Sequence, residues 1–323
     1  MRKVLYLSFG TEMVYDIIRQ TMPPAYTLVT LASNNDAECR AKIQDADVAI
    51  VGAISLTREL IAAARNLRLV HHQGVGYQDM VDMEALSARG ISLALSPEGT
   101  TTVAEHTILL ILATLRQLCY ADSELRAGRW HIASLRPVSR SLAGSTIGYI
   151  GMGRIGQAVA ERLKSFDTRG IYFNSTRLSA QREAELNLYA APLADVLAKA
   201  DIVTLHIPAT SATRHLIDAK ALARMKPGSF LVNTARGSLV DEEALYAALT
   251  SGRIAGAGMD VFETEPPIGS PLLALPNVVV TPHVAAGTRD ALAEKMRAIF
   301  ANIDRFFRGE ALNNAVALQP VRV

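Results

Sequence analysis

Short apolar runs alternate with segments of helical periodicity in the first part of the chain. Some of these runs are continuously apolar, which is typical of strands covered on both faces in a parallel sheet. Helical spacing at residues 58–65 and 80–88 separates some of these runs. The pattern therefore predicts a first α/β unit with strands at residues 4–7, 27–31, 48–51, 67–70 and 91–95.

A second series of apolar runs begins at Ser145, after a helical segment at residues 103–118 that is apolar around most of its circumference and is expected to be buried. Six strands with crossover helices are typical of a doubly wound dinucleotide-binding fold. A last helical pattern at residues 291–307 lies beyond them and is expected to return to the first unit. The six predicted strands are residues 146–150, 170–173, 202–207, 230–234, 257–261 and 278–280.

Composition narrows the classes of protein that these elements could form. The 323 residues suggest about two domains, and 50% are hydrophobic and 20% charged, as in packed globular proteins. Lys and Arg number 33 against 31 Asp and Glu, a balance that argues against a nucleic-acid partner. Two cysteines, no apolar N-terminal segment of signal-peptide length and no long apolar run predict a cytoplasmic protein without membrane contact. We also expect no metal site.

A glycine-rich loop directly follows the strand predicted at residues 146–150 and opens a helical pattern. In such a loop Gly151 permits a tight turn, Gly153 lets the backbone approach a pyrophosphate, and Gly156 allows close packing of helix and strand. The helix N-terminus adds free N–H groups and the positive end of a dipole. The order strand, loop, helix, strand favours a bound dinucleotide over the alternative, a tight turn without a ligand.

The end of the next strand bears on which dinucleotide is bound. NAD sites usually place an acidic residue here for the ribose 2′-hydroxyl, whereas a 2′-phosphate requires a cation. The chain has Asn174, Ser175, Thr176 and Arg177, with no carboxylate before Glu183. This combination favours NADP over NAD, although Arg177 could also be an ordinary surface arginine.

Three later strands end in residues that suit the reduction of a 2-keto acid. Ligands bind at the carboxyl ends of strands in open α/β sheets, and Arg236, Glu265 and His283 follow three successive predicted strands. Arg236 could hold a carboxylate and polarise the neighbouring carbonyl. His283 could protonate the nascent alkoxide, and Glu265 on its other ring nitrogen would stabilise the protonated imidazole. Singly, each is more often a surface or capping residue.

Taken in order, the motifs of the chain resemble those of the D-isomer-specific 2-hydroxyacid dehydrogenases. The motifs stand at residues 74–79, 103–107, 151–156, 206–208, 233–237, 259–266 and 281–283. The resemblance implies that Arg236, Glu265 and His283 are catalytic and that Val75, Gly76, Arg236 and His283 bind the substrate. It implies that Asp260 orients the nicotinamide carboxamide. The implied cofactor contacts are Thr102, Gly151, Gly153, Arg154, Ile155, Gly156, Asn174, Ser175, Thr176, Arg177, His206, Ile207, Pro208, Thr213, Thr234, Ala235, Arg236, Asp260 and His283.

The same resemblance implies an α/β architecture of two doubly wound parallel-sheet domains. A Rossmann dinucleotide-binding domain at residues 100–287 would be inserted into a flavodoxin-like substrate-binding domain at residues 1–99 and 288–323. Family members are usually homodimers joined through the region that spans residues 103–140 here. In the glyoxylate and hydroxypyruvate reductases a tryptophan of this region reaches the neighbouring active site, and Trp130 is the only candidate.

Departures from the family pattern sharpen the expected function. Asn174 stands where most members carry an acidic residue, as in the NADP-dependent glyoxylate/hydroxypyruvate reductase branch. The loop at residues 52–55 lacks the arginine that the phosphoglycerate branch uses for phosphate, and Glu265 argues against the formate branch. We therefore expect a reductase of a small 2-keto acid to a D-2-hydroxy acid. The alternatives are an NAD(P)-sensing, corepressor-like binding protein and a dehydrogenase of another anion such as phosphite or 3-phosphoglycerate.

Overall fold

The computed structural model describes residues 1–317, which divide into two compact units. The first unit contains Met1–Gly99 and the described residues from Gly287 onward, and the second is Thr100–Ala286. The second junction lies one residue before the one predicted from sequence. Among the described residues, no helix has both the length and the apolar character that a membrane crossing requires.

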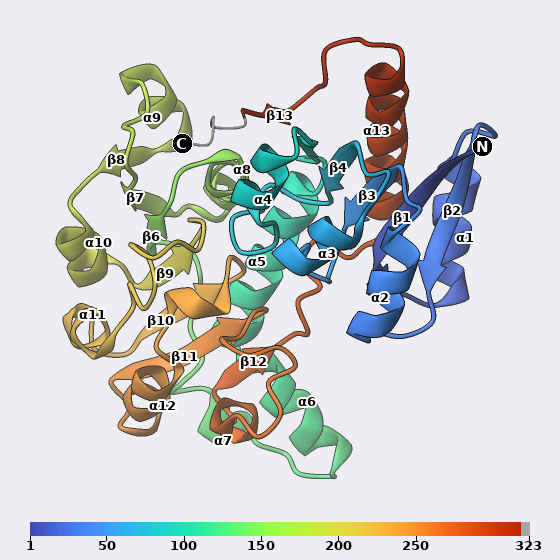
Figure 1. Cartoon of the computed structure of the whole chain (residues 1–323). Helices are drawn as coiled ribbons and strands as arrows, with labels where there is room; N and C mark the ends of the chain where they lie inside the picture. The colour runs from blue at the N-terminus through green and yellow to red at the C-terminus, as the bar shows by residue number, and fades with distance from the viewer. Residues whose placement is uncertain (318–323) are drawn as a thin grey trace. The chain divides into compact units, whose positions relative to one another are not determined.

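The first unit is built on a six-stranded sheet with the order β13-β5-β4-β3-β1-β2 (Figure 1). The five strands of its parallel part are arranged in the 2-1-3-4-5 order of flavodoxin-like folds. Its strands are β1 (Arg2–Phe9), β2 (Tyr26–Leu31), β3 (Val48–Val51), β4 (Leu69–His72), β5 (Ser92–Leu95) and β13 (Ala315–Val316). Its helices are α1 (Glu12–Thr21), α2 (Asp36–Ile43), α3 (Arg58–Ala63), α4 (Met83–Ala88) and α13 (Arg289–Phe307).

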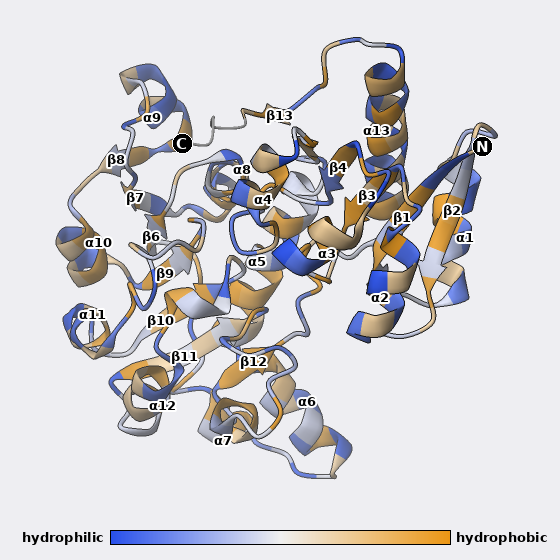
Figure 2. Ribbon diagram, viewed as in Figure 1, coloured by the Kyte–Doolittle hydropathy of each residue, from blue (hydrophilic) through white to orange (hydrophobic). Residues whose placement is uncertain are grey.

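Helices cover both faces of this sheet, as its largely apolar strands predict. Along β1, Leu5 and Leu7 contribute to a core with α2, α3 and α4, whereas Val4 and Tyr6 contribute to a second core with α1 and α13. The hydropathy colours of Figure 2 show apolar strands between helices with mixed faces. The sequence did not predict β13, which pairs antiparallel with β5 at one edge of the sheet.

The second unit is built on a seven-stranded parallel sheet with the order β12-β11-β10-β9-β6-β7-β8, which extends the Rossmann order 3-2-1-4-5-6 by one strand. The prediction of six strands missed β8, which has three residues. Its strands are β6 (Thr146–Ile150), β7 (Arg169–Phe173), β8 (Leu188–Ala190), β9 (Ile202–Leu205), β10 (Ser229–Asn233), β11 (Ile254–Met259) and β12 (Val278–Val280).

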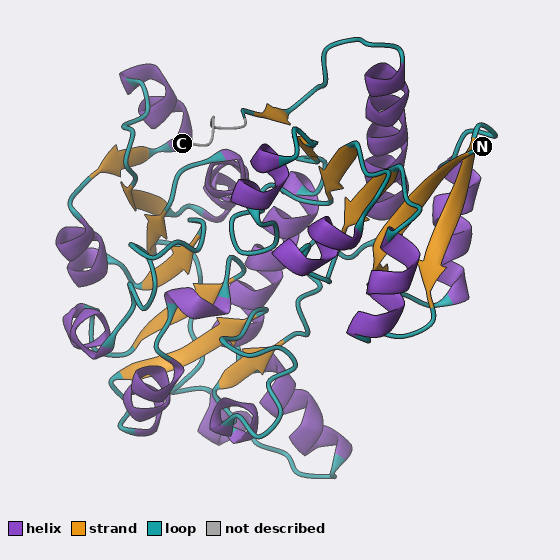
Figure 3. Cartoon of the chain, viewed as in Figure 1, coloured by secondary structure: helices purple, strands orange, loops and turns teal. Residues whose placement is uncertain are grey.

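Helices also cover both faces of the second sheet (Figure 3). Residues of α5 and α8 pack on one face, and residues of α10, α11 and α12 on the other. The helices are α5 (Thr100–Leu115), α6 (Leu118–Arg126), α7 (Ile132–Leu135), α8 (Arg154–Leu163), α9 (Ala180–Leu186), α10 (Leu193–Lys199), α11 (Ala219–Arg224) and α12 (Glu242–Thr250). Three single-turn 3-10 helices are η1 (Lys164–Phe166), η2 (Gly237–Leu239) and η3 (Pro271–Ala274).

The long helix predicted at residues 103–118 is interrupted in the structure. It ends at Leu115 because Gln117 adopts a left-handed conformation with φ of 47°, and α6 begins at Leu118. No residue of α6 is buried, whereas half of the residues of α5 are. The apolar character that predicts burial therefore applies to α5 but not to the segment that follows it.

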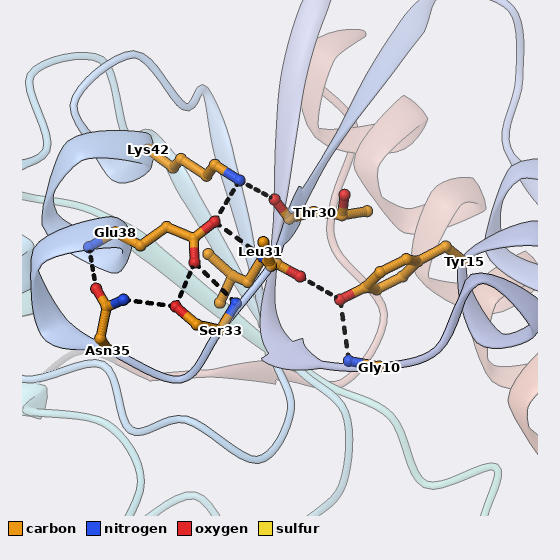
Figure 4. A network of polar contacts seen from close by, with 9 residues as sticks. Gly10, Tyr15, Thr30, Leu31, Ser33, Asn35, Glu38 and Lys42 are labelled. Atoms are coloured by element: carbon orange, nitrogen blue, oxygen red, sulfur yellow. Dashed lines mark hydrogen bonds and ion pairs between the residues drawn. The ribbon is translucent and has the colours of Figure 1, made fainter.

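A network of polar contacts joins the end of β2 to α2 in the first unit (Figure 4). The Glu38 carboxylate accepts hydrogen bonds from the backbone N–H groups of Ala32 at 2.8 Å and Ser33 at 2.9 Å, and from the Ser33 hydroxyl at 2.7 Å. Lys42 Nζ lies 2.6 Å from the same carboxylate. The Ala32 N–H, then Lys42 and Ser33, lower the pKa of Glu38 to about 2. The network holds this carboxylate ionised and fixes the loop after β2.

Candidate functional site

The glycine loop lies at the carboxyl end of β6, at the point where the strand order of the second sheet reverses. Gly151 has φ of +100°, and a Cβ built there would lie 2.4 Å from the carbonyl oxygen of His206. A Cβ on Gly156 would lie 2.4 Å from the carbonyl oxygen of Gly151. Both glycines are therefore required by the protein's own packing, as the sequence predicts.

Gly153 differs from its two neighbours in the motif, because no protein contact requires it. This residue is exposed and forms the N-cap of α8, and a Cβ built on it would meet no described atom within 4 Å. Open space at a helix N-terminus with free N–H groups fits the approach of a pyrophosphate. Arg154 is exposed beside it and Ile155 is partly buried. The loop thus fits a dinucleotide better than it fits a tight turn alone.

The turn after β7 places Asn174 against the glycine loop. Its Oδ1 accepts from the Met152 N–H at 3.2 Å, and its Nδ2 donates to the Thr176 carbonyl at 2.8 Å. The side chain of Asn174 therefore links the two segments that are predicted to hold the cofactor. Ser175 and Thr176 are both exposed.

Arg177 is paired with Glu183, which sequence reasoning did not foresee. Its Nε and one Nη each donate to the Glu183 carboxylate at 2.9 Å, and the Tyr172 hydroxyl donates to the same carboxylate at 2.8 Å. Arg177, followed by Tyr172, lowers the pKa of Glu183. The Arg177 side chain stays 70% exposed. The cation expected to receive a 2′-phosphate is thus present, but its charge is offset by a carboxylate.

The segment after β9 forms the other wall of the glycine loop. His206 Nε2 lies 3.1 Å from the Thr204 hydroxyl, and burial lowers the pKa of His206 to about 3, so its ring is neutral. Ile207 and the exposed Pro208 follow it. The Thr213 hydroxyl donates to the Pro208 carbonyl at 2.9 Å, which closes this loop on itself.

Arg236 follows β10 on a backbone that a buried amide holds. Asn233 has no exposed surface; its Nδ2 donates to the Arg236 carbonyl at 2.8 Å and its Oδ1 accepts from the Ala235 N–H at 3.0 Å. A Cβ on Gly237 would lie 1.8 Å from the carbonyl carbon of Phe262. The Arg236 loop is therefore packed directly on the loop that carries Glu265. Thr234 is buried and its hydroxyl lies 2.9 Å from that of Thr107.

Glu265 and His283 form the ion pair that the sequence predicts. His283 Nδ1 lies 2.7 Å from one Glu265 carboxylate oxygen, and the Phe262 N–H donates to the other at 3.0 Å. Burial raises the pKa of Glu265, but the hydrogen bond and charge of His283, with Phe262 and Arg236, outweigh it and lower the pKa overall. The His283 side chain is 48% exposed. Because Nδ1 is engaged, Nε2 is the ring nitrogen left for a reacting oxygen.

Asp260 anchors the loop that presents His283. It has no exposed surface; one oxygen accepts from the Thr281 hydroxyl at 2.6 Å and the Val284 N–H at 2.9 Å, and the other from the Ala285 N–H at 2.9 Å. His283, between these bonds, has φ of +52°. The sequence resemblance gives Asp260 to the nicotinamide, whereas the geometry gives it a second task, which is to hold the catalytic loop in an uncommon conformation.

The remaining predicted residues are divided between the units. Thr102 lies in the first turn of α5 in the second unit. Val75 and Gly76 lie after β4 in the first unit, where Val75 is 42% exposed. The second unit alone brings together the glycine loop, Arg236, Glu265 and His283 on the carboxyl edge of one sheet.

Sequence reasoning missed the buried polar residues that support this edge. Sequence analysis assigned no role to Asn233 or to His106, although both are polar residues inside apolar segments. Glu242 was not considered, yet it accepts from the Glu263 N–H at 2.6 Å and so holds the segment before Glu265. The sequence signal that could have identified such residues is a polar side chain at an apolar position next to a predicted site motif.

Residues 108–285 match the family described as "D-isomer specific 2-hydroxyacid dehydrogenase, NAD binding domain". A glyoxylate reductase of Korarchaeum cryptofilum is 40% identical over 288 residues, which cover 87% of this chain and 86% of that protein. The chain belongs to the D-isomer-specific 2-hydroxyacid dehydrogenase family. This confirms the family and the α/β fold class expected from the sequence motifs.

Two further proteins that are similar to this chain carry different names. A D-3-phosphoglycerate dehydrogenase of Mycobacterium tuberculosis is 40% identical over 278 residues, which cover 85% of this chain but only 52% of that protein. The chain thus spans about half the length of such relatives. The solved structure of an acyclic imino acid reductase in complex with NADPH and D-Arg has a TM-score of 0.83 and 29% identity, and covers 98% of this chain and 100% of that one.

Proposed function

We propose that the protein reduces a small, unphosphorylated 2-keto acid, such as glyoxylate or hydroxypyruvate, to the D-2-hydroxy acid with NADPH. The observation that carries the proposal is the 2.7 Å pair of His283 and Glu265. This pair lies beside the Arg236 loop and on the same sheet edge as a glycine loop that fits a dinucleotide. The pair, the Arg236 loop and the glycine loop supply the acid, the cation and the cofactor site that the reaction requires.

When bound, the nicotinamide cofactor supplies the hydride that reaches the keto carbon. Arg236 holds the substrate carboxylate and polarises the carbonyl. His283 gives its Nε2 proton to the oxygen as negative charge develops there. Glu265 keeps the imidazolium oriented and balances its charge, so that the acid is protonated before hydride arrives.

The preference for NADPH rests on the turn after β7. Asn174 offers an amide where a carboxylate would repel a phosphate, and Arg177 is exposed at 70% even though Glu183 pairs with it. Two N–H groups of Arg177 bond Glu183, which leaves other guanidinium donors for a 2′-phosphate. A structural relative bound to NADPH is consistent with this preference.

The absence of a substrate phosphate is supported by the loop after β3. Gly52 lies in the part of this loop where the phosphoglycerate branch carries an arginine. A Cβ on Gly52 would lie 2.8 Å from Ser8 Cβ and 2.9 Å from Gln73 Oε1, so a side chain there would require both neighbours to move. Gln73 is itself held at 3.2 Å from the Tyr6 hydroxyl. A small substrate suits this arrangement better than a phosphorylated one.

We further propose a homodimer formed through the segment that includes α6 and α7. Leu118, Leu125, Trp130 and Ile132 are exposed there, Trp130 at 74%, and the helix α6 buries no residue of its own. Sedimentation of the pure protein at several concentrations measures this state, and a monomer throughout would exclude it. The cytoplasmic location inferred from composition stays a prediction.

The decisive test is a steady-state assay of pure protein with a panel of keto acids and both cofactors. We expect the highest kcat/KM with glyoxylate or hydroxypyruvate and NADPH, and a loss of about tenfold for NADPH but not NADH in Arg177→Ala. Arg182→Ala, on the neighbouring helix α9, is the matched control. Equal or inverted kcat/KM for the two cofactors would refute the NADPH preference. Turnover of no substrate would favour the nucleotide-sensing alternative.

A further inference from the structure

One partly buried histidine near the His283 loop is not used by the proposed mechanism. His106 lies in the middle of α5, and its side chain is only 14% exposed. Its Nε2 lies 2.9 Å from the Thr281 hydroxyl and 3.5 Å from an oxygen of Asp260. Thr281 is two residues before His283, so α5 contacts the base of the loop that presents the acid.

The direction of the hydrogen bonds can be worked out from the donors available. The carboxylate of Asp260 only accepts, so the 2.6 Å contact with Thr281 uses the single hydroxyl proton of Thr281. The same hydroxyl has no second proton to give to His106. His106 must therefore carry a proton on Nε2 and donate it to Thr281. The result is a directed chain from His106 through Thr281 to Asp260.

This chain ends on the group that fixes the catalytic loop. Asp260 has no exposed surface and receives the N–H groups of Val284 and Ala285, on the far side of His283. A buried carboxylate depends on every donor it has, because water cannot replace one that is lost. The N–H of His106 engages the Thr281 oxygen from the other side and so holds the hydroxyl proton on Asp260, in the shortest bond that Asp260 receives.

We infer that His106 is a positioning residue for the general acid, acting through Thr281 and Asp260 on the conformation of His283. The inference rests on the proposed role of His283.

Replacing the donor tests the inference. We expect His106→Leu to lower kcat about 10- to 100-fold, as small displacements of catalytic groups do, with KM for NADPH changed less than about threefold. His106→Gln offers an amide N–H near the position of Nε2 and is expected to restore most of the lost kcat. Glu105→Leu, exposed on the same helix, is the control for a general disturbance of α5. Equal losses in the Leu and Gln variants would overturn the inference.

A double-mutant cycle tests the route through Thr281. If His106 acts through that hydroxyl, Thr281→Val lowers kcat on its own, and adding His106→Leu to it lowers kcat little further. Two independent losses that multiply would show that His106 acts by another path, and would contradict the inference.

An exchange measurement separates failure of the inference from failure of the proposed function. Deuterium exchange of the Val284 and Ala285 amides reports on their bonds to Asp260 without any substrate. We expect faster exchange in His106→Leu and wild-type exchange in His106→Gln, even if the wild-type protein turns over no keto acid. Unchanged exchange in His106→Leu would overturn the inference while leaving the assay of keto acids to decide the function.

Discussion

Two carboxylates, Glu38 in the first unit and Glu265 in the second, are each held by several partners but are held differently. Glu38 receives backbone N–H groups, a hydroxyl and the ammonium group of Lys42, at distances from 2.6 to 2.9 Å (Figure 4). Glu265 receives one backbone N–H and one imidazole. The partners of Glu38 are amide, hydroxyl and ammonium donors, whereas the side-chain partner of Glu265 is an imidazole, the group most often used for proton transfer near neutral pH.

This difference separates a structural carboxylate from one that can take part in proton transfer. The donors around Glu38 hold its carboxylate ionised and leave it no proton to transfer. The imidazole partner of Glu265 is the kind of side chain that transfers protons in catalysis, and the His283 side chain is 48% exposed. The geometry of a pair at 2.7 Å alone does not distinguish the two cases; the chemistry of the partner does.

Removal of the His283 imidazole, the partner of Glu265, is expected to have the largest effect on kcat. His283→Ala should lower kcat about 10²- to 10⁴-fold, the usual contribution of a general acid, while NADPH binding measured by fluorescence stays nearly unchanged. His215→Ala is the matched control, because His215 also pairs with a glutamate, Glu263, in the same unit. Substantial residual kcat in His283→Ala would remove His283 from the acid role.

Replacing Glu265 and Glu38 in turn by glutamine tests the difference between the two carboxylates. Glu265→Gln should lower kcat about 10- to 100-fold and move the pH at which keto-acid reduction falls off downward. The reason is that the protonated imidazole loses the negative charge that stabilises it. Glu38→Gln should leave both kcat and its pH profile as in the wild type. The pairing would be contradicted by a Glu265→Gln profile that coincides with that of the wild type.

The sequence predicted the pair of Glu265 and His283 because each residue follows a predicted strand of apolar residues within a few positions. Strand ends in a parallel sheet share one edge, so residue order along the chain was enough to bring Glu265 and His283 together. The pairing of Arg177 with Glu183 escaped prediction for the opposite reason. Glu183 lies in α9 and reaches back across a turn, a contact that depends on local geometry instead of on strand order.

Short and irregular elements were the other omission. The strands β8 and β13 have three and two residues, too few for periodicity to register. The break between α5 and α6 occurs at Gln117 without a glycine or proline to mark it. The role of Asp260 as a loop anchor was also invisible, because its partners Thr281, Val284 and Ala285 are backbone or hydroxyl donors that no sequence motif specifies.

The smallest expected effect concerns the stability of the first unit at acid pH, to which the Glu38 carboxylate contributes. Its folded pKa, lowered to about 2 first by the Ala32 N–H and then by Lys42 and Ser33, lies below that of an unfolded glutamate, about 4.3. Its contribution to stability is therefore fully present above the unfolded value and is lost as pH falls through the interval toward about 2. Glu38→Gln should unfold at lower urea at pH 7 and show a flatter decline of stability below pH about 4.3.

The control for that measurement is Glu12→Gln, since Glu12 has an exposed carboxylate beside Arg19. Surface pairs of this kind contribute little, so its urea midpoint should follow the wild type at every pH. Because two compact units can unfold separately, exchange of amides in β2 and α2 locates the transition in the first unit. A Glu38→Gln midpoint that follows the wild type from neutral to acid pH would mean that the donors around Glu38 add no stability. The Glu38 carboxylate would then contribute neither to folding nor to proton transfer.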